Sequence, residues 1–261
     1  METALRTLIL GVLTVLALLA LGVAHADTVI ESVSSVNGRQ TLTVAGERAR
    51  IDPARAGAPA MLFDAGSGRL VLLNRPASQY NAISVDRLDA LEARVAERRR
   101  RLQRMIEYAD ADERQRLQRR LARLPDLDGD AAIRIETHGE YTRINGFDCE
   151  QAAAIGDEEN THRLCISGAD DLGLAEAAAA TLRQLFDFLA RMRNLLGSGP
   201  APFDARLLQA TLEQADAFPV RIERLDDGTN RTVRGVTTAD VPAERFEVPE
   251  EFTEGARLGG E

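Results

Sequence analysis

The apolar residues of this chain change their spacing at Ser84, and that change constrains the fold more than any other feature. Between residues 28 and 83 they alternate with polar residues and stop at turn signals such as Asn37-Gly38, a pattern typical of short antiparallel strands. After Ser84 they recur every three or four positions, as an amphipathic helix requires. Alternation returns from residue 133. We therefore predict an α+β fold in which an antiparallel sheet is combined with helices.

The apolar spacing of residues 84–125 predicts a helical hairpin inserted between the strands. Ser84 can cap the first helix, Asp110 followed by Glu113 has the spacing of a second helix start, and Pro125 ends that helix. Each helix carries an apolar stripe, which consists of Leu88, Leu91, Val95, Leu102, Met105 and Ile106 in the first and Leu117, Leu121 and Leu124 in the second.

A more apolar helix is predicted to begin at Asp170 and to end at the Gly-Ser-Gly-Pro run 197–200. Its apolar face is wider than a surface helix needs. Two interpretations stay open, because such a face either covers the sheet core or lines a cavity for an apolar ligand. The candidate ligand-binding residues are Leu182, Leu185, Phe186, Leu189 and Met192. A shorter helix at 205–214 and a final strand hairpin follow.

The N-terminus has the pattern of a secretory signal peptide. Arg6 precedes an apolar run that ends near the small-residue triplet 24–26, and cleavage is expected between Ala26 and Asp27. The run is short for a membrane anchor. We expect residues 1–26 to be the signal, residues 27–252 to form a single domain, and residues 253–261 to be a flexible acidic tail. The mature form would be periplasmic or secreted and would not span a membrane.

Cys149 and Cys165 are the two cysteines of the chain and enclose fifteen residues. In an oxidising compartment such a pair is most simply a disulfide. A zinc site can be drawn with His138 and His162, but the local ligand clusters of zinc sites are missing. No Cys-x-x-Cys motif is present to support redox activity. We expect a structural disulfide, no metal and no cofactor.

The net charge of −9 is unevenly distributed, and all 32 basic residues are arginine. Residues 86–124 contain twelve arginines and eight acids, with the run Arg98, Arg99, Arg100 and Arg101 at their centre. One interpretation is a basic arm for anionic lipid, lipopolysaccharide phosphate or an acidic partner. The other is a solvated helical face with intrahelical pairs such as Glu97 with Arg101.

Several classes of activity are disfavoured by the residues present. The acidic balance and the 4% aromatic content do not suit nucleic-acid binding. A phosphate loop of the Walker type needs a lysine, and the chain has none. No G-x-S-x-G elbow accompanies the few histidines. We therefore expect no catalytic residues and no enzymatic activity.

Four segments carry a family resemblance. They are Ile144-Asn145-Gly146-Phe147-Asp148-Cys149, the second cysteine at 165 before a helix, Met61-Leu62-Phe63-Asp64 to Leu72, and Val220-Arg221-Ile222 to Phe246-Glu247-Val248-Pro249. Together they resemble the exported family called domain of unknown function 4412. That family is similar in pattern to the LolA and LolB lipoprotein carriers. The resemblance implies a curved antiparallel half-barrel covered by helices over an apolar cavity.

Two functions remain as hypotheses. The first is a periplasmic binding or carrier module for an apolar or lipid-like ligand. The second is an interaction protein that docks another envelope component through the Arg-rich hairpin. The residues do not predict the oligomeric state.

Overall fold

A twelve-stranded sheet organises the residues that the computed structural model describes, which are 27–53, 55, 57–125, 127, 133–156, 159–196 and 204–255. Its strand order is β12-β6-β5-β4-β3-β2-β1-β11-β10-β9-β8-β7. The strands are β1 (Asp27–Ser34), β2 (Gly38–Ala45), β3 (Arg48–Pro53), β4 (Ala60–Asp64), β5 (Arg69–Asn74), β6 (Gln79–Ser84), β7 (Arg134–Ile144), β8 (Phe147–Gly156), β9 (Glu159–Gly168), β10 (Ala217–Arg224), β11 (Asn230–Ala239) and β12 (Thr253–Glu254).

Strands β1 to β6 form the meander that alternation predicts, each antiparallel to the next. The turn signals lie between them, at Gly46 and Gly68 among others. Gly68 has a φ of +58°, and a Cβ there would lie 3.0 Å from Cγ2 of Val85, so this turn needs a glycine for both conformation and space. The turn joins β4 to β5, and the carbonyl of Gly68 accepts a hydrogen bond from the N of Val85, the first residue of the helix that follows β6, at 2.8 Å.

Strands β7 to β11 form the second half of the sheet, and the pairing of β1 with β11 joins the two halves. The sheet does not close, because β12 and β7 are its two edges. The β7 edge is partly covered by Gln214, whose Oε1 accepts a hydrogen bond from the backbone N of Ile135 at 3.0 Å and whose Nε2 donates to the carbonyl of Ile133 at 2.6 Å. A side-chain amide thus takes the place of a neighbouring strand at this point of an exposed edge.

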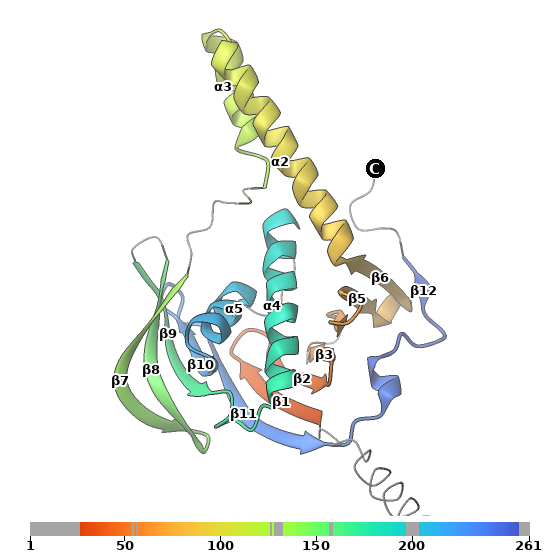
Figure 1. Cartoon of the computed structure of the whole chain (residues 1–261), viewed down its shortest axis with the longest axis vertical. Helices are drawn as coiled ribbons and strands as arrows, with labels where there is room; N and C mark the ends of the chain where they lie inside the picture. Colours follow the sequence, from red (N-terminus) through yellow and green to blue (C-terminus); the bar gives the residue numbers. More distant parts are fainter. Residues whose placement is uncertain are drawn as a thin grey trace, which may run out of the picture.

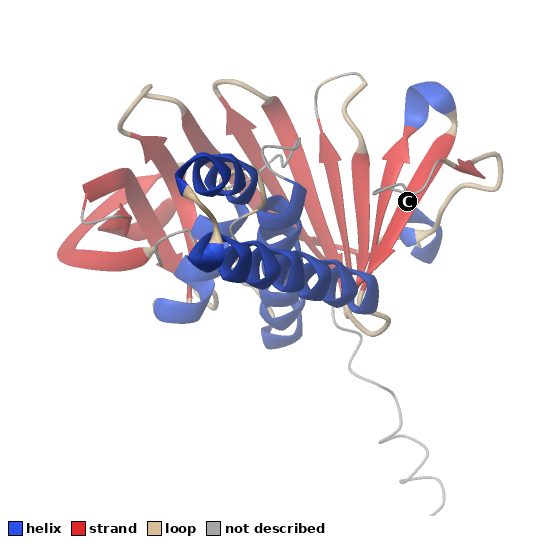
Figure 2. Ribbon diagram, turned by 90° about the horizontal axis from the view of Figure 1, so that it is seen from above, coloured by secondary structure: helices blue, strands red, loops and turns tan. Residues whose placement is uncertain are grey.

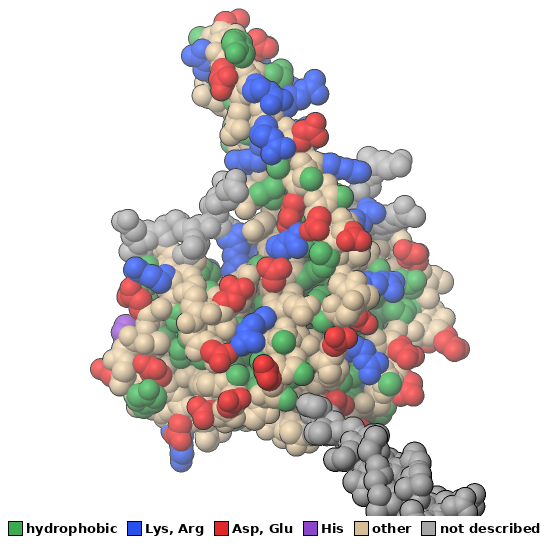
Figure 3. Space-filling model, viewed as in Figure 1, with side chains coloured by type: hydrophobic (Ala, Val, Ile, Leu, Met, Phe, Trp, Pro, Cys, Tyr) green, Lys and Arg blue, Asp and Glu red, His purple; other side chains and the backbone are tan. Residues whose placement is uncertain are grey.

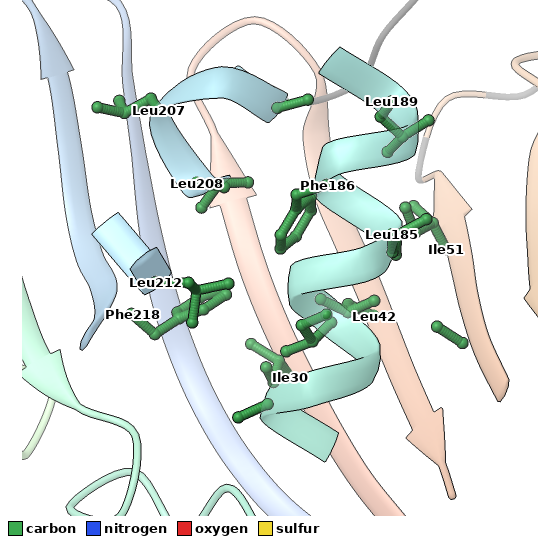
Figure 4. Close-up of a cluster of buried hydrophobic side chains, with 14 of the residues drawn as sticks. Ile30, Leu42, Ile51, Leu185, Phe186, Leu189, Leu207, Leu208, Leu212 and Phe218 are labelled. Carbon is green, nitrogen blue, oxygen red and sulfur yellow. The ribbon is translucent and has the colours of Figure 1, made fainter. Parts of the chain in front are cut away.

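Helices α4 (Glu176–Leu196) and α5 (Ala205–Gln214) lie together on one face of the fanned sheet (Figure 2). Apolar side chains of both helices meet those of β1, β2, β3 and β10 in the main core (Figure 4). The largest are fully buried, Phe186 and Leu207 among them. Helix α4 begins at Glu176 and not at the predicted Asp170, because residues 169–173 form turns and Gly173 has a φ of +71°.

Helices α2 (Val85–Tyr108) and α3 (Ala111–Leu121) form the hairpin expected for residues 84–125, and it projects beyond the rest of the molecule (Figure 1). The predicted caps are present. The hydroxyl of Ser84 accepts a hydrogen bond from the N of Arg87 at 3.3 Å, and Oδ1 of Asp110 accepts one from the N of Glu113 at 2.9 Å. Local sequence signals therefore determine where both helices begin.

The C-terminal segment packs against the β3 to β6 part of the sheet. Its short helix η2 (Ala243–Phe246) places the ring of Phe246 5.0 Å from the guanidinium carbon of Arg48. Val248 and Phe252 then join a second apolar cluster with Leu62 and Val71. We call residues 242–255 the C-terminal strap.

The flexible tail was predicted for residues 253–261, but the first of these residues are part of the sheet. Thr253 and Glu254 form β12, which pairs in parallel with β6, and the backbone N of Gly255 donates to the carbonyl of Tyr80 at 2.8 Å. The apolar contacts of Phe252 bring this segment onto the sheet, which acidic composition alone did not indicate. Residues 256–261 of the predicted tail lie outside the described residues.

The arrangement confirms an α+β fold built on a large, curved, open and mostly antiparallel sheet with four α-helices among the described residues. The predicted signal peptide, residues 1–26, lies outside the described residues. Asp27, on the other side of the predicted cleavage point, is the first residue of β1. Among the described helices, none combines the length and apolar character needed to cross a membrane.

Candidate functional site

The helical hairpin, which we call the arm, has a base and an outer part with different surroundings. In the base, residues 85–97, Leu88 is fully buried, and Leu91 and Val95 pack against the main core. Arg191 of α4 binds the base through ion pairs with Asp89 and Glu92. The outer part, residues 98–124, has a small core of its own, made by Leu102, Ile106, Ala109, Leu117, Leu121 and Leu124.

The charge of the arm divides at the same point. The base residues 86–97 carry two arginines and four acids, whereas the outer residues 98–124 carry ten arginines and four acids. The net charge of the whole arm is therefore the sum of −2 in the base and +6 in the outer part. The acidic base is the part that meets Arg191, and the basic part is the part that projects (Figure 3).

The run of four arginines at the start of the outer part is divided between two roles. Arg98, Arg100 and Arg101 are exposed. Arg99 is half-buried and donates from NH1 to the carbonyl of Pro125 at 3.0 Å, so it holds the segment that follows α3 beside α2. Consecutive residues of a helix point 100° apart, so the four side chains differ in their surroundings. The contact of these arginines with a partner or an anion stays a prediction.

The outer part also carries a basic stripe that the prediction missed. Arg116, Arg119 and Arg120 on α3 and Arg123 in the turn after it follow i, i+3, i+4, i+7 spacing, and all four are exposed. With the exposed residues Arg98, Arg100, Arg101 and Arg104 they make eight arginines that form no side-chain hydrogen bond or ion pair with any other described residue. The spacing is visible in the sequence, although the unbroken run 98–101 is the more conspicuous basic feature.

An apolar and aromatic edge accompanies these arginines. Tyr108 is 89% exposed and Met105 is 42% exposed. A shallow groove of about 370 Å³ lies here and is lined by Arg101, Arg104, Met105, Tyr108, Ala109 and Glu113. An exposed tyrosine beside guanidinium groups is a combination typical of surfaces that meet a membrane interface.

The five candidate ligand-binding residues all lie in the main core. Leu182, Phe186 and Leu189 are fully buried, and Leu185 and Met192 are nearly so. They pack with β-strand residues such as Ile30, Leu42 and Ile51 (Figure 4). Their arrangement fits the interpretation of this face as a cover for the sheet core, and their role in binding a ligand stays a prediction.

Cys149 and Cys165 form the predicted disulfide between β8 and β9. Both are buried, and their Cα atoms are 5.4 Å apart. Because both sulfur atoms are used in this bond, neither is free to be a ligand in the zinc site that could be drawn with His138 and His162. The described residues contain no group of three or more His, Cys, Asp or Glu side chains that could hold a metal ion.

The two described histidines of the zinc hypothesis differ in burial. His138 is exposed on β7, whereas His162 is 8% exposed, with its Nε2 3.5 Å from Oδ2 of Asp204. Burial lowers the pKa of His162, and the charge of Asp204 opposes that shift. Burial also lowers the pKa of Arg231 to about 10, again against the charge of Asp204. Asp204 therefore compensates two basic groups at this end of the core.

A second electrostatic centre links the strap to the sheet. The carboxylate of Asp52 accepts hydrogen bonds from Arg50 at 2.6 and 2.8 Å, from Arg75 at 2.7 Å and from Arg245 of the strap at 2.9 Å. Burial would raise the pKa of Asp52, but the hydrogen bonds from Arg50 and the three positive charges hold it below its usual value. This centre holds the fold together and leaves the carboxylate no free position.

Burial raises the pKa of Asp187, which lies on α4 near the base of the arm. The charges of Glu213 and Glu92 act in the same direction, and the charge of Arg191 opposes them. Arg191 is therefore the cation that compensates the acidic side of the junction between α4, α5 and the arm.

Comparisons with known proteins place the chain in a family without assigning an activity. No curated protein matches the sequence. Two solved structures of PNGF-II, in the P21 and C2 space groups, each show 8% identity and a TM-score of 0.38, with 88% of this chain covered. The chain spans 31% of the length of PNGF-II. An uncharacterized conserved protein from Thermus thermophilus shows 9% identity and a TM-score of 0.41, with 89% of this chain and 91% of that chain covered.

The family comparison is more specific. The matching family model is described as Domain of unknown function (DUF4412) and covers residues 116–252. Three of the four segments that carry the resemblance fall inside this range, and the hairpin from Met61 to Leu72 precedes it. The match begins on α3, takes in the arginine stripe and the disulfide, and ends in the C-terminal strap. The chain belongs to the DUF4412 family.

Proposed function

We propose that this chain is an exported, non-enzymatic protein that docks onto the anionic, phosphate-bearing lipid surface of the cell envelope through the outer part of its arm. The observation that carries the proposal is the projecting outer part, with its net charge of +6 and eight exposed arginines without partners among the described residues. A basic helical hairpin held by its base is suited to reach a surface that the acidic body would avoid.

The chemistry of arginine supports phosphate as the ligand group. A guanidinium can donate two parallel hydrogen bonds to one phosphate, which an ammonium group cannot do. Each basic side chain near an anionic membrane contributes about 1 kcal/mol to binding. Tyr108 and Met105, exposed among the arginines, would lie at the headgroup level.

Export is supported by two features. Residues 1–26 have the pattern of a signal peptide. The disulfide between Cys149 and Cys165 is a bond that persists mainly in oxidising compartments.

The carrier hypothesis has weaker support. The curved open sheet with helices on one face is consistent with the half-barrel of the LolA and LolB carriers. In those carriers the helices would cover a cavity, whereas α4 here fills the same face with buried side chains such as Phe186 and Leu189. We therefore favour docking over transport.

A vesicle sedimentation assay tests the proposal. Protein comprising residues 27–261 is mixed with vesicles of phosphatidylglycerol and phosphatidylcholine, or of phosphatidylcholine alone. We expect binding to the anionic vesicles only, and its loss at 1 M salt, where the Debye length is about 3 Å. Replacing Arg116, Arg119, Arg120 and Arg123 with glutamine should weaken binding by roughly two to three orders of magnitude, since four charges are removed at about 1 kcal/mol each.

A matched control removes the same charge elsewhere. Arg39, Arg55, Arg69 and Arg94 are exposed outside the outer part and form no side-chain hydrogen bond or ion pair with a described residue. Their replacement with glutamine should leave most of the binding. Equal losses in both variants would show that net charge, and not the outer part of the arm, drives association. Binding by the stripe variant at the parent's level would refute the proposal.

A further inference from the structure

A second candidate site lies in strands β7 to β10, at the opposite end of the sheet from β6, the strand that leads into the arm. Alternation places Arg163 and Cys165 on the face of β9 opposite to the core residue Leu164. In the same way, Arg221 and Glu223 alternate with the core residue Ile222 on β10. These side chains therefore project from the sheet face that α4 and α5 do not cover.

The register brings these residues together. Gln151 of β8 pairs with Cys165, and Cys165 pairs with Arg221, so the three form one row across three strands. Arg163 pairs with Glu223 in the adjacent row. The disulfide between Cys149 and Cys165 joins β8 to β9 within this group. Strands pinned in this way hold their side chains in a fixed arrangement before any ligand arrives.

The hairpin of β7 and β8 bends over this face and bounds it. Its turn residue Asn145 donates from Nδ2 to the carbonyl of Val233 on β11 at 2.7 Å, and its Oδ1 accepts a hydrogen bond from Arg234 at 3.3 Å. The turn thus reaches a strand three places away in the sheet order. The partly open space, which we call the curl pocket, has a volume of about 470 Å³ and is lined by Thr142, Ile144, Gln151, Arg163, Leu164, Cys165, Arg221 and Glu223.

The charges in the curl pocket do not balance. Arg163 and Arg221 both approach the same oxygen of Glu223, each at 3.4 Å. Close ion pairs of this kind have distances of about 2.7–2.9 Å, so both contacts are long. Each guanidinium has five N–H donors, and one carboxylate cannot use them all. The pocket therefore presents free donors and a net positive charge within a body that is acidic overall.

We propose that the curl pocket binds a small organic anion whose carboxylate groups are held by Arg163 and Arg221. Gln151 and Thr142 supply hydrogen bonds to hydroxyl or further carboxylate oxygens, and Ile144 contacts the carbon skeleton. Glu223 sets the affinity by competing with the ligand for both guanidiniums. A volume of about 470 Å³ is within the range of small-molecule sites, which is about 300–1,000 Å³. This site does not depend on docking by the arm.

Isothermal titration calorimetry with citrate tests the site. Citrate has three carboxylates and a hydroxyl, which match the donors of the pocket. The titration uses residues 27–261 with the four stripe arginines replaced by glutamine, so that anion binding by the arm does not contribute. We expect one citrate per chain in a buffer of constant ionic strength. R163Q and R221Q should each weaken binding at least tenfold, and E223Q should strengthen it.

R143Q is the matched control. Arg143 follows the lining residue Thr142 on β7, is not among the lining residues and pairs with Asp148 at 2.6 Å, so its loss should not change citrate affinity. Thermal unfolding of each variant shows whether it is folded. The proposal is overturned if no citrate binding is detected at millimolar concentration. It is also overturned if folded R163Q or R221Q binds citrate as tightly as the parent protein, or if E223Q binds it more weakly.

Discussion

Arg191 of α4 holds the carboxylate of Glu92 on α2 with two hydrogen bonds, from Nε to Oε1 at 3.0 Å and from NH2 to Oε2 at 2.8 Å. The same guanidinium reaches Asp89 one turn earlier. A guanidinium that donates two hydrogen bonds to one carboxylate fixes the relative orientation of the two side chains as well as the distance between them. It sets the direction in which the arm leaves the sheet.

Replacing Arg191 with glutamine should therefore loosen the base of the arm without unfolding its outer part. Asp89, Glu92 and Asp187 would then lack their shared cation, whereas the outer helices keep their own apolar cluster. We expect faster amide hydrogen exchange in residues 88–97 and unchanged exchange in α3. R183Q is a suitable control, since Arg183 lies on the same helix and pairs with Asp216 away from the arm. Equal effects of both variants on the base would contradict this role.

The fully buried Phe186 distinguishes a packed core from a ligand cavity. If its ring fills the core, F186A should lower the free energy of unfolding by about 3–5 kcal/mol. Y108A, at an exposed site, should change it by less than about 0.5 kcal/mol. Urea unfolding measures both. A stable F186A protein that has lost a co-purifying lipid would instead support the carrier hypothesis.

Removal of the disulfide should destabilise the sheet between β8 and β9. The loop-entropy relation gives about 3 kcal/mol for a loop of this length. A variant with alanine at both 149 and 165 should unfold at lower urea concentration than the parent and should not respond to reductant. In the folded parent, a thiol reagent applied without reductant should label neither cysteine. Labelling of both would show that the bond is absent in the protein tested.

Asp52 should stabilise the attachment of the C-terminal strap. D52N leaves Arg50, Arg75 and Arg245 without a shared anion and should cost about 1–2 kcal/mol. Because the folded pKa of Asp52 is lowered, this stability is present above the unfolded value of about 3.9 and is lost as the pH falls through the folded pKa. Limited proteolysis should cut the strap of D52N faster than that of the parent.

Asp148 provides the control for this prediction. It makes an equally short ion pair with Arg143, but both side chains are exposed. D148N should therefore have little effect on unfolding. If D52N and D148N lower the free energy of unfolding by the same small amount, burial does not make the Asp52 ion pairs more stabilising than exposed ones.

His162 should make the protein less stable in mild acid. Its folded pKa lies below the unfolded value of about 6.5, so the unfolded chain takes up a proton first as the pH falls. Stability should drop from about pH 6.5 down to the folded pKa, despite the nearby carboxylates of Asp204, Asp226 and Asp227. H162Q should remove this part of the pH dependence in urea unfolding at pH 7.5 and 5.5. If H162Q leaves the difference in unfolding free energy between pH 7.5 and 5.5 unchanged, other titratable groups cause the pH dependence.

Local elements were predictable because their signals are local. Ser84 and Asp110 cap their helices through contacts three residues away. The helix at 205–214 and the meander before Ser84 follow apolar periods within a few residues. The start of α4 was misplaced because Gly173 ends a turn that resembles a helix start in sequence. The tail was misjudged because β12 depends on strand β6, which is distant in sequence.

The candidate sites also have some features that the sequence shows and others that depend on the tertiary structure. The basic character of residues 86–124 was evident from composition, but its separation into an acidic base and a basic outer part depends on where Arg191 lies. Arg99 could not be told from its neighbours until Pro125 was placed beside it. Arg163 and Glu223 are sixty residues apart, and strand register alone makes them neighbours.

The sequence by itself determined the period of each segment, the helix caps and the two cysteines available for a bond, because these depend on residues within one or two turns of each other. The tertiary structure decided which arginines are engaged and which are free, and it created the curl pocket. Those properties depend on pairing between distant strands and on how far the sheet bends, and no local pattern of side chains specifies either of them.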